Sequence, residues 1–105
     1  MSGSAVAPLT EAVYYILLSL YSPLHGYGIM QNVKKLTDGR LELGAGTLYG
    51  AINALLSKGF IEEYPSDTPK KQYVITDLGK NAVQAEIVRL QELIKNGQQI
   101  LKEND

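Results

Sequence analysis

The sequence predicts an α+β domain of the winged helix-turn-helix type, with three helices, a two-stranded wing and one long terminal helix. The order of its periodic segments is helix, helix, helix, strand, strand, helix, and its 105 residues match one such domain. Its composition, 45% hydrophobic and 20% charged, is that of a folded chain. We expect residues 9–76 to form the winged domain and residues 77–105 the terminal helix, within one compact unit.

The first two helices are predicted between residues 10 and 36. Thr10 can cap the first helix, and Ser22-Pro23 ends it, because the residue before a proline avoids helical geometry. The apolar stripe of the first helix consists of Val13, Ile16, Leu17 and Leu20. A second helix is predicted over Gly26–Leu36, and Thr37-Asp38-Gly39 is its stop signal. Its inward residues are predicted to be Tyr27, Met30, Val33 and Leu36.

A third helix is predicted from Gly44–Thr47 to Lys58-Gly59, where the glycine ends it. Its buried face is predicted to consist of Leu48, Ile52, Leu55 and Leu56. The opposite face carries small residues, Gly50, Asn53 and Ser57. A face of this size fits the major groove of DNA, which is about 12 Å wide. Asn53 can pair with adenine, and Tyr49 can reach a phosphate. Thr47 adds a hydroxyl beside the unpaired backbone N–H groups at the start of this predicted helix. An amphipathic surface helix whose polar face has no function explains this helix equally well.

The two predicted strands are Phe60–Tyr64 and Gln72–Thr76, which are rich in aromatic and β-branched residues. The loop between them ends in Lys70 and Lys71. A hairpin with a basic tip suits a wing that holds a nucleic-acid backbone. Paired lysines are also common in solvated loops, so this signal is weak by itself.

The final helix is predicted to start at Thr76-Asp77 and to run to about Glu103. Asn96-Gly97 is a stop signal that predicts a frayed or bent last turn. Its apolar seam has 4-3-4-7 spacing and consists of Val83, Ile87, Leu90, Ile94 and Leu101. The preceding domain already has its own core, so this apolar seam needs another surface against which it can be buried. The first helix of a twofold-related copy would supply it in a homodimer, and the chain's own first helix is the alternative.

Composition and hydropathy exclude several classes of function. The chain has no cysteine and one histidine, so we expect no disulfide, no metal site and no cofactor. Residues 13–20 are apolar but far short of the about 20 residues that a membrane span requires. We therefore expect a cytoplasmic protein with no membrane partner, and assign Met1–Ser4 no structural role.

An enzymatic function has little support in the sequence. Gly44-x-Gly46-x-x-x-Gly50 is similar to a dinucleotide-binding loop, but its spacing is off by one and no parallel crossover follows. Glu62 and Glu63 are adjacent on a strand and face opposite sides. His25 has no acid or nucleophile near it in sequence. We expect no catalysis.

Four motifs occur in order along residues 9–103: His25–Ile29, Gly46–Tyr49, Leu56–Ile61 and Lys71–Gly79. Together they resemble the PadR family of winged-helix transcriptional regulators. The length and single terminal helix resemble its shorter subgroup. The resemblance implies a homodimeric, DNA-binding protein, usually a repressor, that binds double-stranded DNA at a pseudo-palindromic operator. Some members of the family are released by phenolic or planar hydrophobic compounds.

Carried over residue by residue, the resemblance implies DNA contacts from Tyr27, Thr47, Tyr49, Asn53, Lys70 and Lys71. Two positions depart from the family's pattern. The approach to the wing is Thr68-Pro69-Lys70-Lys71, with lysines where arginines are usual, which can alter minor-groove contact. Gly28 stands where an acidic residue often follows the tyrosine of the second-helix motif.

Tyr14, Tyr15 and Tyr21 lie beyond the apolar stripe of the predicted first helix. Such aromatic residues can line an interface that encloses a small hydrophobic ligand, or simply pack in that interface. Some relatives stack flat ligands on a tryptophan of the terminal helix. This chain has none, and Leu90 lies about where it would be. A winged-helix dimer that binds proteins without sequence-specific DNA binding remains the alternative function, because the net charge is −1.

Overall fold

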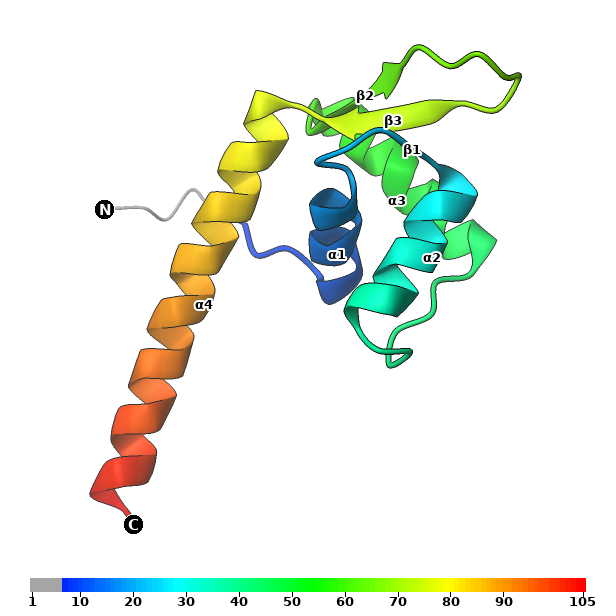
Figure 1. The fold of residues 1–105 in the computed structure, drawn as a ribbon. Helices are drawn as coiled ribbons and strands as arrows, with labels where there is room; N and C mark the ends of the chain where they lie inside the picture. The colour runs from blue at the N-terminus through cyan, green and yellow to red at the C-terminus, as the bar shows by residue number, and fades with distance from the viewer. Residues whose placement is uncertain (1–6) are drawn as a thin grey trace.

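A computed structural model describes residues 7–105 and leaves residues 1–6, which include Met1–Ser4, outside the description. The elements, in order, are α1 (Glu11–Ser19), β1 (Leu24–His25), α2 (Gly26–Leu36), α3 (Ala45–Lys58), β2 (Ile61–Tyr64), β3 (Gln72–Ile75) and α4 (Asp77–Glu103). The first three helices gather beneath a small sheet, and α4 extends away from them as a separate rod (Figure 1). The predicted winged-helix fold is confirmed.

The sheet has three antiparallel strands in the order β1-β3-β2, where the sequence predicts two. The wing hairpin pairs Ile61 with Ile75 and Tyr64 with Gln72. The third strand, β1, is not predicted from the sequence. It pairs with β3, and Leu24 lies opposite Tyr73. Two residues are too few to show any periodicity, so sequence patterns cannot reveal β1. Its pairing places the start of α2 directly beside the wing.

The core joins all three helices of the domain to the sheet and to the start of α4. It consists of Ile16, Leu17, Leu20, Ile29, Val33, Leu48, Ile52, Leu55, Ile61, Tyr73, Ile75 and Val83. The predicted stripes of α1 and α3 agree with this set, except that Val13 and Leu56 are only half-buried against it, but the stripe of α2 is partly wrong. Tyr27 and Leu36 are exposed, whereas Ile29 is buried. Two residues correspond to about 200° of helix rotation, so burial of Ile29 turns Tyr27 outward.

α1 ends at Ser19, earlier than the predicted stop at Ser22-Pro23. The carbonyl of Leu20 accepts a hydrogen bond from the Ile75 backbone N–H at 2.8 Å, so the sheet binds the chain just after the helix. Tyr21 therefore lies outside α1, and the prediction that it belongs to the first helix with Tyr14 and Tyr15 is wrong. Its ring lies under the Lys80 ammonium, 5.7 Å from the ring centre.

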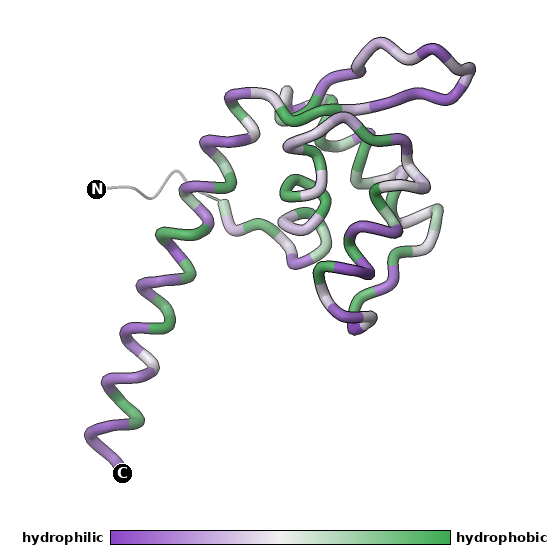
Figure 2. The backbone as a smooth tube through the Cα atoms, viewed as in Figure 1, coloured by the Kyte–Doolittle hydropathy of each residue, from purple (hydrophilic) through white to green (hydrophobic). Residues whose placement is uncertain are grey.

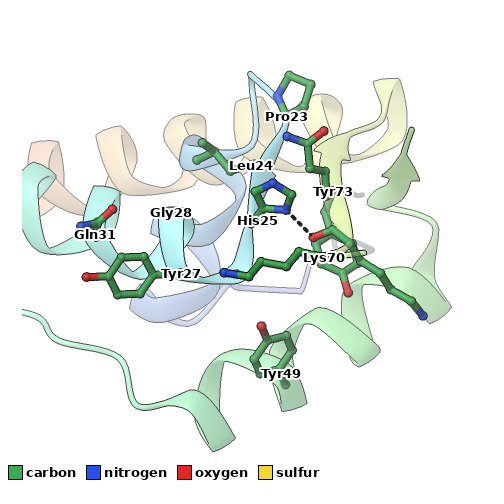
Figure 3. A pocket seen from close by; sticks show the side chains of 12 residues that line it. Pro23, Leu24, His25, Tyr27, Gly28, Gln31, Tyr49, Lys70 and Tyr73 are labelled. Atoms are coloured by element: carbon green, nitrogen blue, oxygen red, sulfur yellow. Dashed lines mark hydrogen bonds between the residues drawn. The ribbon is translucent and has the colours of Figure 1, made fainter. Parts of the chain in front are cut away.

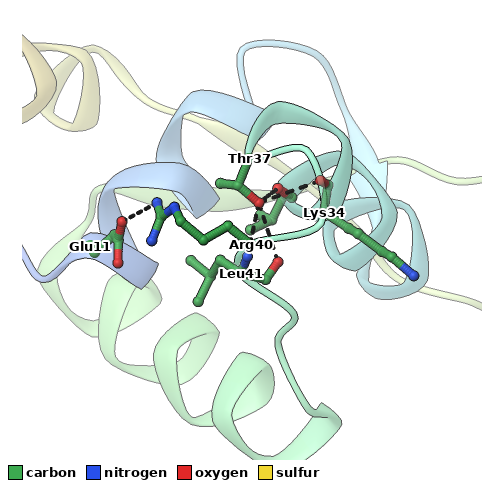
Figure 4. A network of polar contacts seen from close by, with 6 residues as sticks. Glu11, Lys34, Thr37, Arg40 and Leu41 are labelled. Carbon is green, nitrogen blue, oxygen red and sulfur yellow. Dashed lines mark hydrogen bonds and ion pairs between the residues drawn. The ribbon is translucent and has the colours of Figure 1, made fainter.

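The segment between α2 and α3 is held by two sets of side-chain contacts, one made by Thr37 and one by Arg40 (Figure 4). The hydroxyl of Thr37 donates to the Val33 carbonyl at 2.9 Å and accepts from the Leu41 N–H at 3.1 Å. Arg40 forms an ion pair with Glu11 at the start of α1, and this pair keeps the pKa of Glu11 below its ordinary value. These contacts define where α3 begins relative to α1 and α2.

The junction between β3 and α4 is held by Thr76, which caps α4. Its hydroxyl donates to the Gly59 carbonyl at 2.6 Å and accepts from the Gly79 N–H at 3.1 Å. Its backbone N–H donates to the Phe60 carbonyl at 3.0 Å. A Cβ at Gly79 would lie 2.1 Å from that same carbonyl oxygen, so only glycine lets α4 approach this closely.

α4 packs on the domain only through its first half. Val83 and Glu86 are buried, but residues 91–105 are all exposed. The helix has 27 residues and is about 40 Å long, and apolar residues recur along its free half (Figure 2). It passes through Asn96-Gly97 without a break and ends at Glu103, as predicted, so the last turn is not frayed as the Asn96-Gly97 signal indicated. One glycine costs about 1 kcal/mol, which a long helix of good helix formers tolerates.

Glu86 fastens the N-terminal segment to α4. Its carboxylate accepts from the Leu9 backbone N–H at 3.2 Å and from Arg89 at 3.0 and 2.5 Å. The Arg89 guanidinium, with the Leu9 N–H, holds the pKa of Glu86 below its ordinary value of 4.5 against the effect of burial. The side chain is 3% exposed, so its charge depends on these partners.

Replacing Gly79 by alanine should destabilise the fold by about 2–3 kcal/mol, because the added Cβ meets the Phe60 backbone. Gly50→Ala is the matched control. It is a helical glycine with open space around it, and alanine there should raise stability by about 0.5–1 kcal/mol. Urea unfolding at one protein concentration measures both. Equal stability of Gly79→Ala and wild type would contradict the close approach.

Glu86→Gln should lower stability at neutral pH by about 1–3 kcal/mol, because the Arg89 charge loses its partner. A carboxyl whose pKa is lowered in the folded state stabilises above its ordinary pKa, and this contribution disappears as pH falls through the folded value. The difference between variant and wild type should therefore shrink by about pH 3. Urea unfolding at both pH values tests this, with Glu62→Gln on the exposed face of β2 as the control.

Candidate nucleic-acid interface

α3 presents one polar face to solvent and buries the other. Leu48, Ile52 and Leu55 hold it in the core, while Thr47, Tyr49 and Asn53 are exposed as predicted. Its N-cap, Gly44, supplies no side-chain hydrogen bond. The N–H groups of the first turn therefore remain available to an acceptor outside the helix.

A groove of about 610 Å³ lies between the start of α2, the side of α3 and the base of the wing (Figure 3). Four of the six predicted contact residues line it: Tyr27, Tyr49, Lys70 and Lys71. The structure brings these residues together from three elements that are far apart in sequence. The other two, Thr47 and Asn53, lie on α3 outside the groove lining.

Tyr49 crosses from α3 to the first turn of α2. A Cβ at Gly26 would lie 2.3 Å from the Tyr49 hydroxyl oxygen, so the phenol rests directly against the Gly26 backbone. Glycine at this position therefore lets the Tyr49 ring of α3 lie against the start of α2. This contact gives a physical reason for a glycine in the His25–Ile29 motif, because a larger residue at position 26 would displace the Tyr49 ring.

The wing is attached to the start of α2 by His25. Its ring Nδ1 lies 3.1 Å from the Lys71 carbonyl oxygen, and its backbone pairs with Gln72 in the sheet. Sequence analysis missed this role, because His25 and Lys71 are 46 residues apart and no local pattern joins them.

The two wing lysines carry positive charge at the rim of the groove. Both side chains are exposed, and the Lys71 ammonium lies 3.6 Å from the Glu63 carboxylate. An exposed pair of this kind contributes little to stability, so Lys71 can exchange Glu63 for a phosphate at small cost. Among residues 7–105, no group of three or more acidic or histidine side chains is placed to hold a metal ion.

A second hollow, of about 360 Å³, lies between α1 and α4. Tyr14 and Tyr15 line it with Glu86, Arg89 and Leu90, and the two phenol rings meet edge to face at 5.6 Å. Tyr21 does not line it. Of the three tyrosines predicted as a possible ligand pocket, only Tyr14 and Tyr15 therefore lie together beside α4.

The three-helix core, the hairpin and the outward polar face of α3 define a winged-helix protein. Residues 14–85, more than half of the chain, match the transcriptional regulator PadR-like family. The chain therefore belongs to the PadR-like family of transcriptional regulators. It functions in transcription regulation and is not an enzyme, as the sequence predicts. Within the described part of the chain, no helix combines the length and apolar character that crossing a membrane demands.

Solved structures of similar fold include several PadR proteins. A regulator from Clostridium difficile is 23% identical, with a TM-score of 0.73 over 88% of this chain and 99% of its own. One from Eggerthella lenta is 25% identical, with a TM-score of 0.71 over 85% and 80% of the two chains. Bacillus subtilis PadR in complex with operator DNA is 26% identical, with a TM-score of 0.66 over 77% and 49%. Comparison with curated proteins returns no match.

Proposed function

We propose that the protein is a homodimeric transcriptional repressor that binds a pseudo-palindromic operator in double-stranded DNA. The observation that carries this proposal is the groove, which joins residues of α2, α3 and the wing on one side of the domain. Nucleic-acid recognition needs such a combination, because one element reads bases while others hold the backbone. That Bacillus subtilis PadR was solved in complex with operator DNA supports the same use of the fold here.

In this proposal α3 enters the major groove. Asn53 faces base edges and is suited to adenine, while Thr47 and Tyr49 reach phosphate or base edges. α3 has no arginine, so the bidentate arginine contact to guanine is not expected from it. Tyr27 at the start of α2 and the wing lysines hold the flanking backbone.

The dimer would form along α4. Val83 is buried in the chain's own core, so the seam available to a partner begins at Ile87 and continues through Leu90, Ile94 and Leu101. Half of a helix without tertiary contacts is marginal in water, and a second copy would cover its apolar side. Twofold symmetry would then place two α3 helices about one DNA turn, or 34 Å, apart.

A small hydrophobic compound is proposed to release the repressor. The hollow beside Tyr14 and Tyr15 supports this, because it is also lined by Leu90 of the seam. A ligand there would contact both α1 and the proposed interface. We expect this regulation in the cytoplasm, together with the DNA.

The repressor proposal is tested by binding to the intergenic DNA upstream of the protein's own gene, at low and high salt. Tight binding, above that to a scrambled duplex and steeply weakened by salt, is the expected result. The alternative is a dimer that joins proteins, which the net charge of −1 favours. It would show no binding to any DNA at low salt.

Removing both wing charges with Lys70→Ala and Lys71→Ala should weaken binding to all duplexes and lower the salt slope by about two. Each lysine contributes one phosphate contact in the proposal. The matched control is Lys95→Ala with Lys102→Ala, which removes the same charge from α4, away from the wing. Titration across salt concentrations measures the slopes. An unchanged slope in the wing variant would remove the wing from the interface.

Leu90→Asp should produce monomers, because it buries a carboxylate in the proposed seam. Val88→Asp is the control, since Val88 is 65% exposed and lies on the opposite side of α4. Sedimentation equilibrium of both variants distinguishes the cases. A dimer that survives Leu90→Asp would show that the seam is misassigned.

A further inference from the structure

We propose that the DNA interface continues beyond the groove along α2, where Lys34 and Lys35 bind phosphates of the DNA backbone. This inference rests on the proposed DNA-binding function and adds a second basic contact to it. Neither lysine is among the contacts that the family resemblance implies. Three observations support it: an adjoining hollow, the charges that line it, and an exposed ion pair inside it.

A second hollow, of about 470 Å³, lies between α2 and the segment that leads into α3. It shares Tyr27 and Gln31 of α2 with the groove, so the two hollows adjoin along this helix (Figure 3). Glu42 and Leu43 also line it, and α3 begins two residues later, at Ala45. The second hollow therefore lies beside the helix that is proposed to read DNA.

The exposed face of α2 carries a row of side chains that leads from the groove into the second hollow. Tyr27, Gln31 and Lys34 are spaced by four and three residues, which places them on one side of the helix. All three are exposed, because burial of Ile29 turns this side outward. The row is about 10 Å long. Each DNA strand carries one phosphate per about 3.4 Å of axis, so the row is long enough to face more than one.

The charges that line the two hollows favour an anionic partner. Four of the ten basic residues of the chain line them, namely Lys34, Lys35, Lys70 and Lys71. Of its eleven acidic residues, all of them within residues 7–105, Glu42 alone does so. The whole chain has a net charge of −1, so this positive charge is a local concentration. Lysines placed from the wing to the last turn of α2 suit the phosphate backbone of DNA.

Glu42 is the partner of Lys34 in the free protein. Its carboxylate lies 3.3 Å from the Lys34 ammonium, and both side chains are more than half exposed. An exposed pair of this kind contributes little to stability, so a phosphate can replace Glu42 at small cost. Glu63 and Lys71 form the same arrangement at the wing, at 3.6 Å. In both places DNA must displace a carboxylate of the protein, so Glu42 weakens binding to every duplex.

The first test measures DNA binding by Lys34→Ala with Lys35→Ala across salt concentrations. Each lysine contributes one phosphate contact, so the salt slope should fall by about two per protomer. Affinity should fall by the same factor for the upstream duplex and for a scrambled duplex, because backbone contacts do not depend on base sequence. The matched control is Lys95→Ala with Lys102→Ala on the free half of α4, which should leave the slope unchanged.

Glu42→Gln should act in the opposite direction. It removes the competing carboxylate and keeps the shape of the side chain, so affinity for both duplexes should rise by about two- to fivefold. Glu92→Gln on α4 changes the net charge equally and is the control. A protein that fails to fold cannot bind more tightly, so this result does not depend on the folding of the lysine variant.

An unchanged salt slope in the lysine variant, with wild type bound to DNA, would overturn the inference and leave the proposed function intact. The lysines would then act only on the dipole of α2, and urea unfolding alone would change. A loss confined to the upstream duplex would also overturn it, because the lysines would then read bases. Equal affinities of Glu42→Gln and wild type would contradict the role given to Glu42. Absence of wild-type binding to any DNA at low salt would instead refute the proposed function.

Discussion

The position of α4 depends on Thr76, whose backbone and hydroxyl together make four hydrogen bonds at one corner of the domain. Two of them reach the carbonyls of Gly59 and Phe60, directly after α3, and in the other two Thr76 accepts from the Gly79 and Lys80 N–H groups at the start of α4. The end of the exposed helix α3 and the start of the projecting helix α4 are therefore parts of one rigid junction. Any surface presented by α3 has a defined direction relative to the surface presented by α4. In a protein that pairs through α4, this junction would determine the spacing of its two α3 helices.

The opposite end of the sheet is held by a smaller set of contacts. β1 has two residues, and it joins the wing to α2 through backbone pairing and through the His25 ring. Because Tyr49 rests on Gly26 at the same corner, α3, α2 and the wing meet around one groove. The chain as a whole is slightly acidic, yet the charged residues that line this groove beside His25 are lysines. Local arrangement, and not total charge, gives this surface its character.

α4 divides into a half that belongs to the domain and a half that does not. Val83 closes the core and Glu86 binds the N-terminal segment, whereas the residues from 91 onwards are all exposed. A small domain has a limited core, and leaving Ile94 and Leu101 exposed sacrifices apolar burial that the chain needs. This imbalance is the physical reason for proposing that the free half contacts a second copy.

The sequence was sufficient to predict every element except β1, and their order, because long segments such as α3 and α4 carry strong periodicity and clear caps at Gly59 and Thr76. It also identified which α3 residues face outward. Tertiary structure alone decided which of the candidate residues meet, since Tyr27, Tyr49 and Lys71 come together through contacts between distant segments. The strand β1, the outward turn of Tyr27 and the separation of Tyr21 from the other tyrosines followed from the same cause. Two-residue pairings and single close approaches leave no periodic trace in a sequence, because they depend on partners many residues away.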